Sequence, residues 1–110
     1  MNIWALKKAE PLRAVLLLLQ SQLGDEAFSV DTDTACGAEA IWLVGNQPPH
    51  ARAYLYTLGH PRERYGVHLE YPNMAAPLYD VFENLRLSSL VEILAVHFDV
   101  AHIAPLPLTK

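Results

Sequence analysis

The chain has 110 residues, of which 12 are acidic and 8 are basic, so its formal net charge is −4. This length suits a single domain spanning residues 1–110, and an apolar fraction of 52% excludes an intrinsically disordered chain. The negative charge repels a phosphate backbone, which disfavours nucleic acid as a partner and favours a basic protein.

The first predicted element is a helix that starts near Pro11, a residue suited to a first helical turn, and ends near Gly24. One apolar stripe with helical spacing runs along it, formed by Leu12, Val15, Leu16, Leu19 and Leu23. Leu17 and Leu18 lie off this stripe. Either the helix is buried on more than one side, or part of its surface is an interface.

Four strands are predicted next, at Ala27–Val30, Ala38–Val44, Arg52–Leu58 and Tyr65–Tyr71. The second contains a continuous apolar run, which predicts a strand covered on both faces. The last two flank a segment rich in breakers, residues 59–64, and form an antiparallel hairpin. In the last run Tyr65, Val67, Leu69 and Tyr71 alternate with polar residues or glycine, so their face belongs to the core.

The C-terminal part has two helical patterns. Leu78, Val81, Phe82 and Leu85 follow a helical spacing and predict a short helix from about Ala76 to Asn84. The run from Ser89 to Glu92 matches a capping box and predicts a helix that starts there and ends near Asp99. We therefore expect an α+β fold: an N-terminal helix, a three- or four-stranded antiparallel sheet, and one or two C-terminal helices packed on one sheet face.

No arrangement of residues indicates a reaction centre. The five histidines have no spacing typical of a zinc site, and the run from Asp31 to Thr34 is typical of a solvated turn. The five glycines are too scattered for a phosphate-binding loop, so we expect no cofactor and no metal. The single cysteine, Cys36, favours a reducing compartment, and the apolar run Ala14–Leu19 is too short for a signal peptide or a membrane span. These features predict a cytoplasmic protein.

Tyrosines mark the most informative surface. Tyr54 and Tyr56 share one face of their strand, but Ala53 and Leu55 make the other face apolar too, so the sequence leaves open which face is buried. If the tyrosines face outward, they lie opposite Gly66, His68 and Glu70 and form a docking surface, since aromatic residues are enriched at interfaces. A basic cluster around the hairpin turn, comprising Arg52, Arg62 and Arg64 with His50 and His60, is interpreted as a solvated loop tip.

The predicted function is protein binding without catalysis, in the form of a small bacterial immunity or antitoxin-type neutraliser of a basic toxin domain. The predicted partner-binding residues are Tyr54, Tyr56, His68, Glu70, Asp31, Asp33, Arg62 and Arg64. The partner is another protein, with neither nucleic acid nor membrane, and the chain is a monomer or a homodimer. Two alternatives are a dimeric secretion chaperone or adaptor that pairs through Leu17 and Leu18, and a small enzyme that uses Cys36 or His68.

Overall fold

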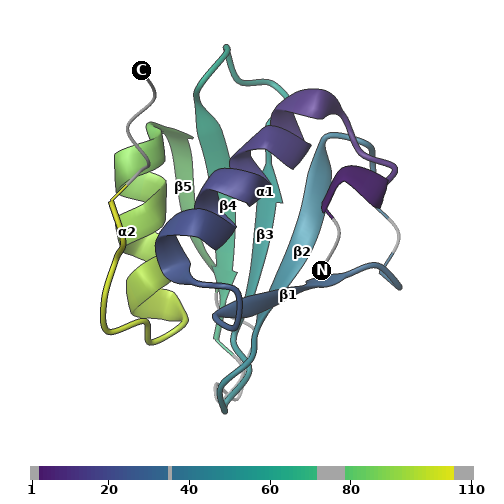
Figure 1. Cartoon of the computed structure of the whole chain (residues 1–110). Coiled ribbons are helices and arrows are strands. Elements are labelled where there is room, and N and C mark those ends of the chain that lie inside the picture. The colour runs from purple at the N-terminus through teal and green to yellow at the C-terminus, as the bar shows by residue number, and fades with distance from the viewer. Residues whose placement is uncertain (1–2, 35, 72–78, 106–110) are drawn as a thin grey trace.

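A five-stranded sheet with two helices on one of its faces forms the body of the protein (Figure 1). The computed structural model describes residues 3–34, 36–71 and 79–105. Its elements in chain order are the 3-10 helix η1 (Ile3–Ala5), α1 (Glu10–Leu23), β1 (Phe28–Asp31), β2 (Ala40–Gly45), β3 (Arg52–Tyr56), β4 (Tyr65–Glu70), β5 (Tyr79–Leu85) and α2 (Leu87–His97). The α+β class and the N-terminal helix are confirmed.

Helix α1 follows its sequence pattern closely. Pro11 lies in its first turn, and Gly24 ends it with a φ of 103°, a conformation that glycine adopts without steric cost. The N–H of Gly24 donates a hydrogen bond of 3.0 Å to the carbonyl oxygen of Gln20. All five residues of the predicted apolar stripe are buried. Leu17 packs against the core at half burial, so the helix is covered on more than one side.

The sheet is a simple meander with strand order β1-β2-β3-β4-β5, and each strand is antiparallel to the next. The antiparallel sheet is confirmed, but it has five strands rather than three or four. The central register places Trp42 opposite Tyr54 and Tyr54 opposite His68.

The fifth strand replaces the helix predicted from Ala76 to Asn84. Residues 79–85 form β5, which pairs with β4, while residues 76–78 lie outside the described residues. The predicted helix is wrong because the spacing of the apolar residues at 81, 82 and 85 fits a bulged strand as well as a helix. The ladder to β4 has an irregularity between Tyr65 and Val67, which breaks the strand period there.

Helix α2 starts earlier than its predicted cap. Leu87 is its first residue and Arg86 its N-cap, which makes no side-chain capping bond, so the predicted start at Ser89 is wrong. The helix nevertheless buries the expected side, including Leu90 and Leu94, and ends at His97.

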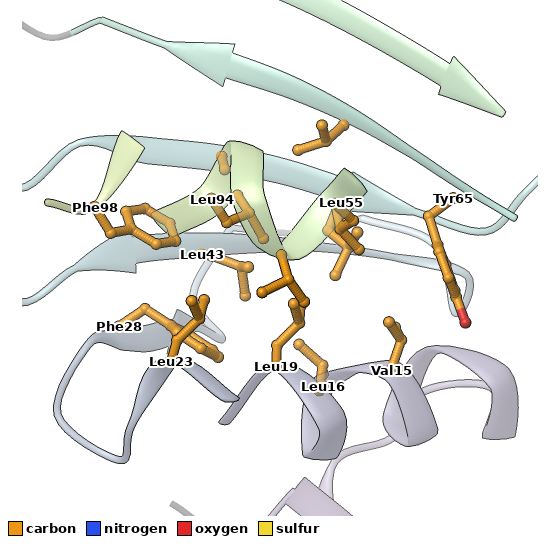
Figure 2. Packing of buried hydrophobic residues seen from close by; sticks show 14 of the residues in the cluster. Val15, Leu16, Leu19, Leu23, Phe28, Leu43, Leu55, Tyr65, Leu94 and Phe98 are labelled. Carbon is orange, nitrogen blue, oxygen red and sulfur yellow. The ribbon is translucent and has the colours of Figure 1, made fainter. Parts of the chain in front are cut away.

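The core fills the space between the sheet and the two helices, as Figure 2 shows. Leu16 and Leu19 of α1 meet Leu43 and Leu55 of the sheet and Leu94 of α2, and all five are fully buried. Burying each such side chain stabilises the fold by about 1.5 to 3 kcal/mol relative to exposure. One sheet face is thereby occupied by the helices. Within the described ranges, no helix is long and apolar enough to cross a membrane.

Candidate protein-binding face

The sheet face turned away from the helices, called here the open face, carries a set of half-exposed side chains. Successive strand residues point to opposite faces, so the neighbours of the buried Leu43, Ala53 and Leu55 point away from the core. The open face comprises Asp31, Trp42, Val44, Arg52, Tyr54, Tyr56, Gly66, His68, Glu70, Val81 and Glu83. The prediction that the strand of Trp42 is covered on both faces is therefore wrong, because Trp42 and Val44 are only half-buried.

Four rings form a continuous aromatic row on this face: Trp42, Tyr54, Tyr56 and His68. The centroid of Tyr54 lies 5.1 Å from that of Trp42, 5.6 Å from that of Tyr56 and 5.8 Å from that of His68. The hydroxyl of Tyr56 lies 3.2 Å from Nε2 of His68. Such ring pairs add about 0.5 to 1.5 kcal/mol each beyond their buried area and hold the rings in fixed positions.

Gly66 is required beneath the ring of Tyr56, its direct partner across the β3–β4 ladder. A Cβ atom on Gly66 would overlap the ring carbons and hydroxyl of Tyr56. The absence of a side chain lets the ring lie across β4 and reach His68.

Among the described residues of the open face, Arg52 alone carries a guanidinium. Its Nη2 lies 2.9 Å from Oδ2 of Asp31, its Nη1 lies 4.0 Å from Oε2 of Glu70, and its Cζ lies 4.4 Å from the centroid of the Trp42 ring. The interpretation of Arg52 as part of a basic cluster at the hairpin turn is wrong, because Arg52 begins β3 at the end opposite that turn. A stacked, ion-paired guanidinium is well ordered for recognition.

Hydrogen bonds from the following turn hold the Asp31 carboxylate. Its Oδ1 accepts from the N–H groups of Asp33 (2.9 Å) and Thr34 (3.1 Å), and its Oδ2 accepts from the Thr34 hydroxyl (2.7 Å). The Thr34 hydroxyl, then these N–H groups and the charge of Arg52, lower the pKa of Asp31. The carboxylate therefore stays ionised at neutral pH.

At the other end of the face, His60 joins the β3–β4 connection to β5. Its side chain is 8% exposed, with Nε2 lying 2.9 Å from Oε2 of Glu83 and Nδ1 lying 3.1 Å from the carbonyl oxygen of Leu58. Its ring meets that of Tyr56 edge-on at 5.4 Å. Burial, reinforced by the neighbouring Glu83 carboxylate, raises the pKa of Tyr56 to about 12.

The structure brings five of the eight predicted partner-binding residues to this face: Tyr54, Tyr56, His68, Glu70 and Asp31. Asp33 lies in the turn after β1, exposed and beside Asp31. Arg62 and Arg64 lie in the β3–β4 connection and line a groove of about 600 Å³ with Leu18 of α1. Sequence reasoning missed Val81 and Glu83, which lie on the unpredicted strand, although the β-formers Tyr79 and Val81 were a signal for it.

The groups considered for catalysis lie in separate places. Cys36 lies in the β1–β2 connection, where its Sγ is 3.2 Å from the carbonyl oxygen of Ala40 and 3.5 Å from Nζ of Lys8. A hollow of about 360 Å³ beside it is lined by no described histidine, while His68 lies on β4. In the part of the chain that the structure describes, no three histidine, cysteine or acidic residues are placed to hold a metal ion.

Comparisons of the chain with protein-family models, with curated proteins and with solved structures give no match.

Proposed function

We propose that this chain is a non-catalytic protein-binding domain that docks a basic protein on its open face. The observation that carries the proposal is the aromatic row, which lies half-exposed on a sheet face that none of the described helices covers. Large rigid aromatic rings offer contact area at a small cost in conformational entropy, which makes them frequent anchors of protein interfaces.

The charge of the open face favours a cationic partner. Its carboxylates are Asp31, Glu70 and Glu83, and its one permanent cation is Arg52, so three negative charges against one positive charge leave −2. The whole chain carries −4. Local and overall charge thus attract a basic surface from a distance, which raises the association rate and fixes orientation.

The concrete form of the proposal is a stoichiometric neutraliser of the immunity or antitoxin type. Such a protein acts by covering the working surface of a basic toxin domain, and it needs a flat, rigid, negatively charged face rather than a reaction centre. The five-stranded meander supplies a rigid support for the rings.

Affinity capture with a matched pair of variants tests the proposal. Tyr54→Ala removes the central ring of the aromatic row, whereas Val96→Ala removes an apolar side chain that is 84% exposed on α2. We expect wild type and Val96→Ala to capture one basic protein in a 1:1 complex, and Tyr54→Ala to lose at least about tenfold in affinity, as at an interface hot spot. Amide spectra confirm that both variants are folded.

The capture is repeated at low and high salt, because ions weaken an electrostatically steered complex. A captured protein that is acidic, or that binds wild type and Tyr54→Ala equally, contradicts the proposal. So does a wild-type chain that captures no protein from its native lysate.

A further inference from the structure

The open face holds a guanidinium of its own, and this arrangement shows which chemistry the face accommodates. The guanidinium of Arg52 stacks on the ring of Trp42 and bonds the carboxylate of Asp31, which is the direct cross-strand neighbour of Trp42. On this sheet, an aromatic ring beside a carboxylate therefore binds a guanidinium cation.

The same two components occur a second time, one strand pair further along. Tyr54 lies in the middle of the aromatic row on β3, and Glu70 is its diagonal neighbour on β4, since Arg52 pairs with Glu70 and Tyr54 pairs with His68. Diagonal neighbours on one sheet face are within reach of long side chains. This second pair repeats the ring and carboxylate of the first.

No hydrogen bond to the Glu70 carboxylate is present within the described ranges. Among the described residues its one charged contact is Nη1 of Arg52 at 4.0 Å, which is beyond hydrogen-bond distance, and its side chain is only 24% exposed. By contrast, Asp31 accepts four hydrogen bonds, one from Arg52 and three from the turn that follows it. A half-buried carboxylate gains most from a charged donor that brings its own hydrogen bonds.

We infer that the partner inserts an arginine side chain that stacks on Tyr54 and donates hydrogen bonds to the carboxylate of Glu70. Arginine fits better than lysine, because its planar guanidinium covers a ring and presents a fork of N–H groups to a carboxylate. This inference rests on the proposed function, since it names the partner contact at the same face.

A titration of the full chain with N-acetyl-arginine amide, followed by amide NMR, tests the site without the partner. N-acetyl-glutamine amide is the uncharged control probe. We expect saturable shifts centred on Tyr54, His68 and Glu70 with the arginine probe alone. Glu70→Gln weakens its binding by about two- to fivefold, the usual range for one partly exposed ion pair, whereas Glu92→Gln, at an exposed position on α2, leaves it unchanged.

Shifts spread over the whole acidic surface, or equal weakening by Glu70→Gln and Glu92→Gln, would overturn the inference. Capture of the protein partner distinguishes failure of this inference from failure of the proposed function. If the captured partner needs Tyr54 but binds Glu70→Gln as tightly as wild type, the arginine contact is wrong and the docking face stands. If the arginine probe binds at Glu70 and wild type captures no protein, the cation site stands and the proposed function fails.

Discussion

The close approach of Tyr56 to Gly66 is a feature on which the shape of the open face depends. Replacement of Gly66 by alanine displaces the far end of the Tyr56 ring, which can rotate. It also removes the entropic cost of a glycine in a strand, about 0.5 to 1 kcal/mol. We therefore expect Gly66→Ala to change the free energy of unfolding by no more than about 1 kcal/mol while moving the ring.

The titration of Tyr56 reports that movement. In Gly66→Ala the pKa of Tyr56, about 12 in the native protein, falls towards the ordinary value of about 10, which the 13Cζ shift of labelled tyrosine measures. Gly37→Ala is the matched control, because a Cβ there meets no atom within 4 Å. An unchanged titration in Gly66→Ala would mean that Gly66 does not position the ring.

The raised pKa of Tyr56 also predicts that the protein loses stability at alkaline pH. The native pKa of Tyr56, about 12, exceeds the ordinary tyrosine value of 10.0, so the folded state binds more protons between these two values. This contribution is fully present below pH 10 and is lost as the pH rises towards about 12. We expect Tyr56→Phe to flatten the loss over this interval in urea unfolding measured against pH. A slope equal to that of wild type contradicts the assignment.

The lowered pKa of Asp31 predicts a loss of stability at acidic pH. Its native pKa lies below the ordinary aspartate value of 3.8, so its contribution to stability is present above that pH and is lost as the pH falls through the lower native value. Thr34→Val removes the hydroxyl donor and should raise the pKa of Asp31, read from its carboxyl 13C shift. Thr32→Val, at an exposed neighbour, should leave it in place. Equal shifts in the two variants would refute the role of the Thr34 hydroxyl.

At the scale of elements, α1 offers a direct comparison of two leucines. Leu16 is fully buried in the core, whereas Leu18 is half-buried at the wall of the groove. Leu16→Ala should lower the free energy of unfolding by about 2 to 5 kcal/mol, as cavity-forming substitutions do, and Leu18→Ala by less than about 1.5 kcal/mol. Chemical denaturation measures both. Similar losses in the two variants would show that the groove wall belongs to the core.

The elements that the sequence predicts correctly are those with one dominant period. The stripe of α1 and the alternation in β4 each follow one period clearly, although Leu17 and Leu18 extend the apolar surface of α1 beyond its stripe. Strand β3 is ambiguous, since Ala53 and Leu55 are as compatible with burial as Tyr54 and Tyr56. The structure resolves this ambiguity, because Ala53 pairs with Leu69 and Leu55 pairs with Val67. These four side chains share the core face, so Tyr54 and Tyr56 point outward.

Strand β5 shows a second limit of local patterns. It is stabilised by pairing with the edge of β4, which lies outside residues 79–85, so the pattern of these residues alone does not show the pairing. The same limit of local patterns applies to the residues of the open face. Aromatic content and charge predict the partner-binding residues Tyr54, Tyr56, His68, Glu70 and Asp31, whereas placing Val81 and Glu83 on this face requires the unpredicted strand.

For the whole molecule, the two-layer arrangement separates hydrophobic stability from recognition. The helices cover one sheet face and hold the buried leucines, so substitutions on the open face leave most of the core intact. Affinity and stability are therefore expected to respond to different sets of residues, with Tyr56 and Gly66 as the positions where the two overlap.

The same separation applies to charge. Glu70→Gln with Glu83→Gln removes two charges from the open face, and Glu10→Gln with Glu92→Gln removes two from the helices, so both double variants change the net charge from −4 to −2. Screening limits exposed charges to a range of about 10 Å at 0.1 M salt, so only charges near the docking surface steer the encounter strongly. We expect the first double variant to bind the captured partner about tenfold more slowly at about 0.1 M salt, and the second less than about threefold more slowly, in stopped-flow measurements. Equal slowing of both would show that net charge alone guides association and that the partner approaches without preference for the open face.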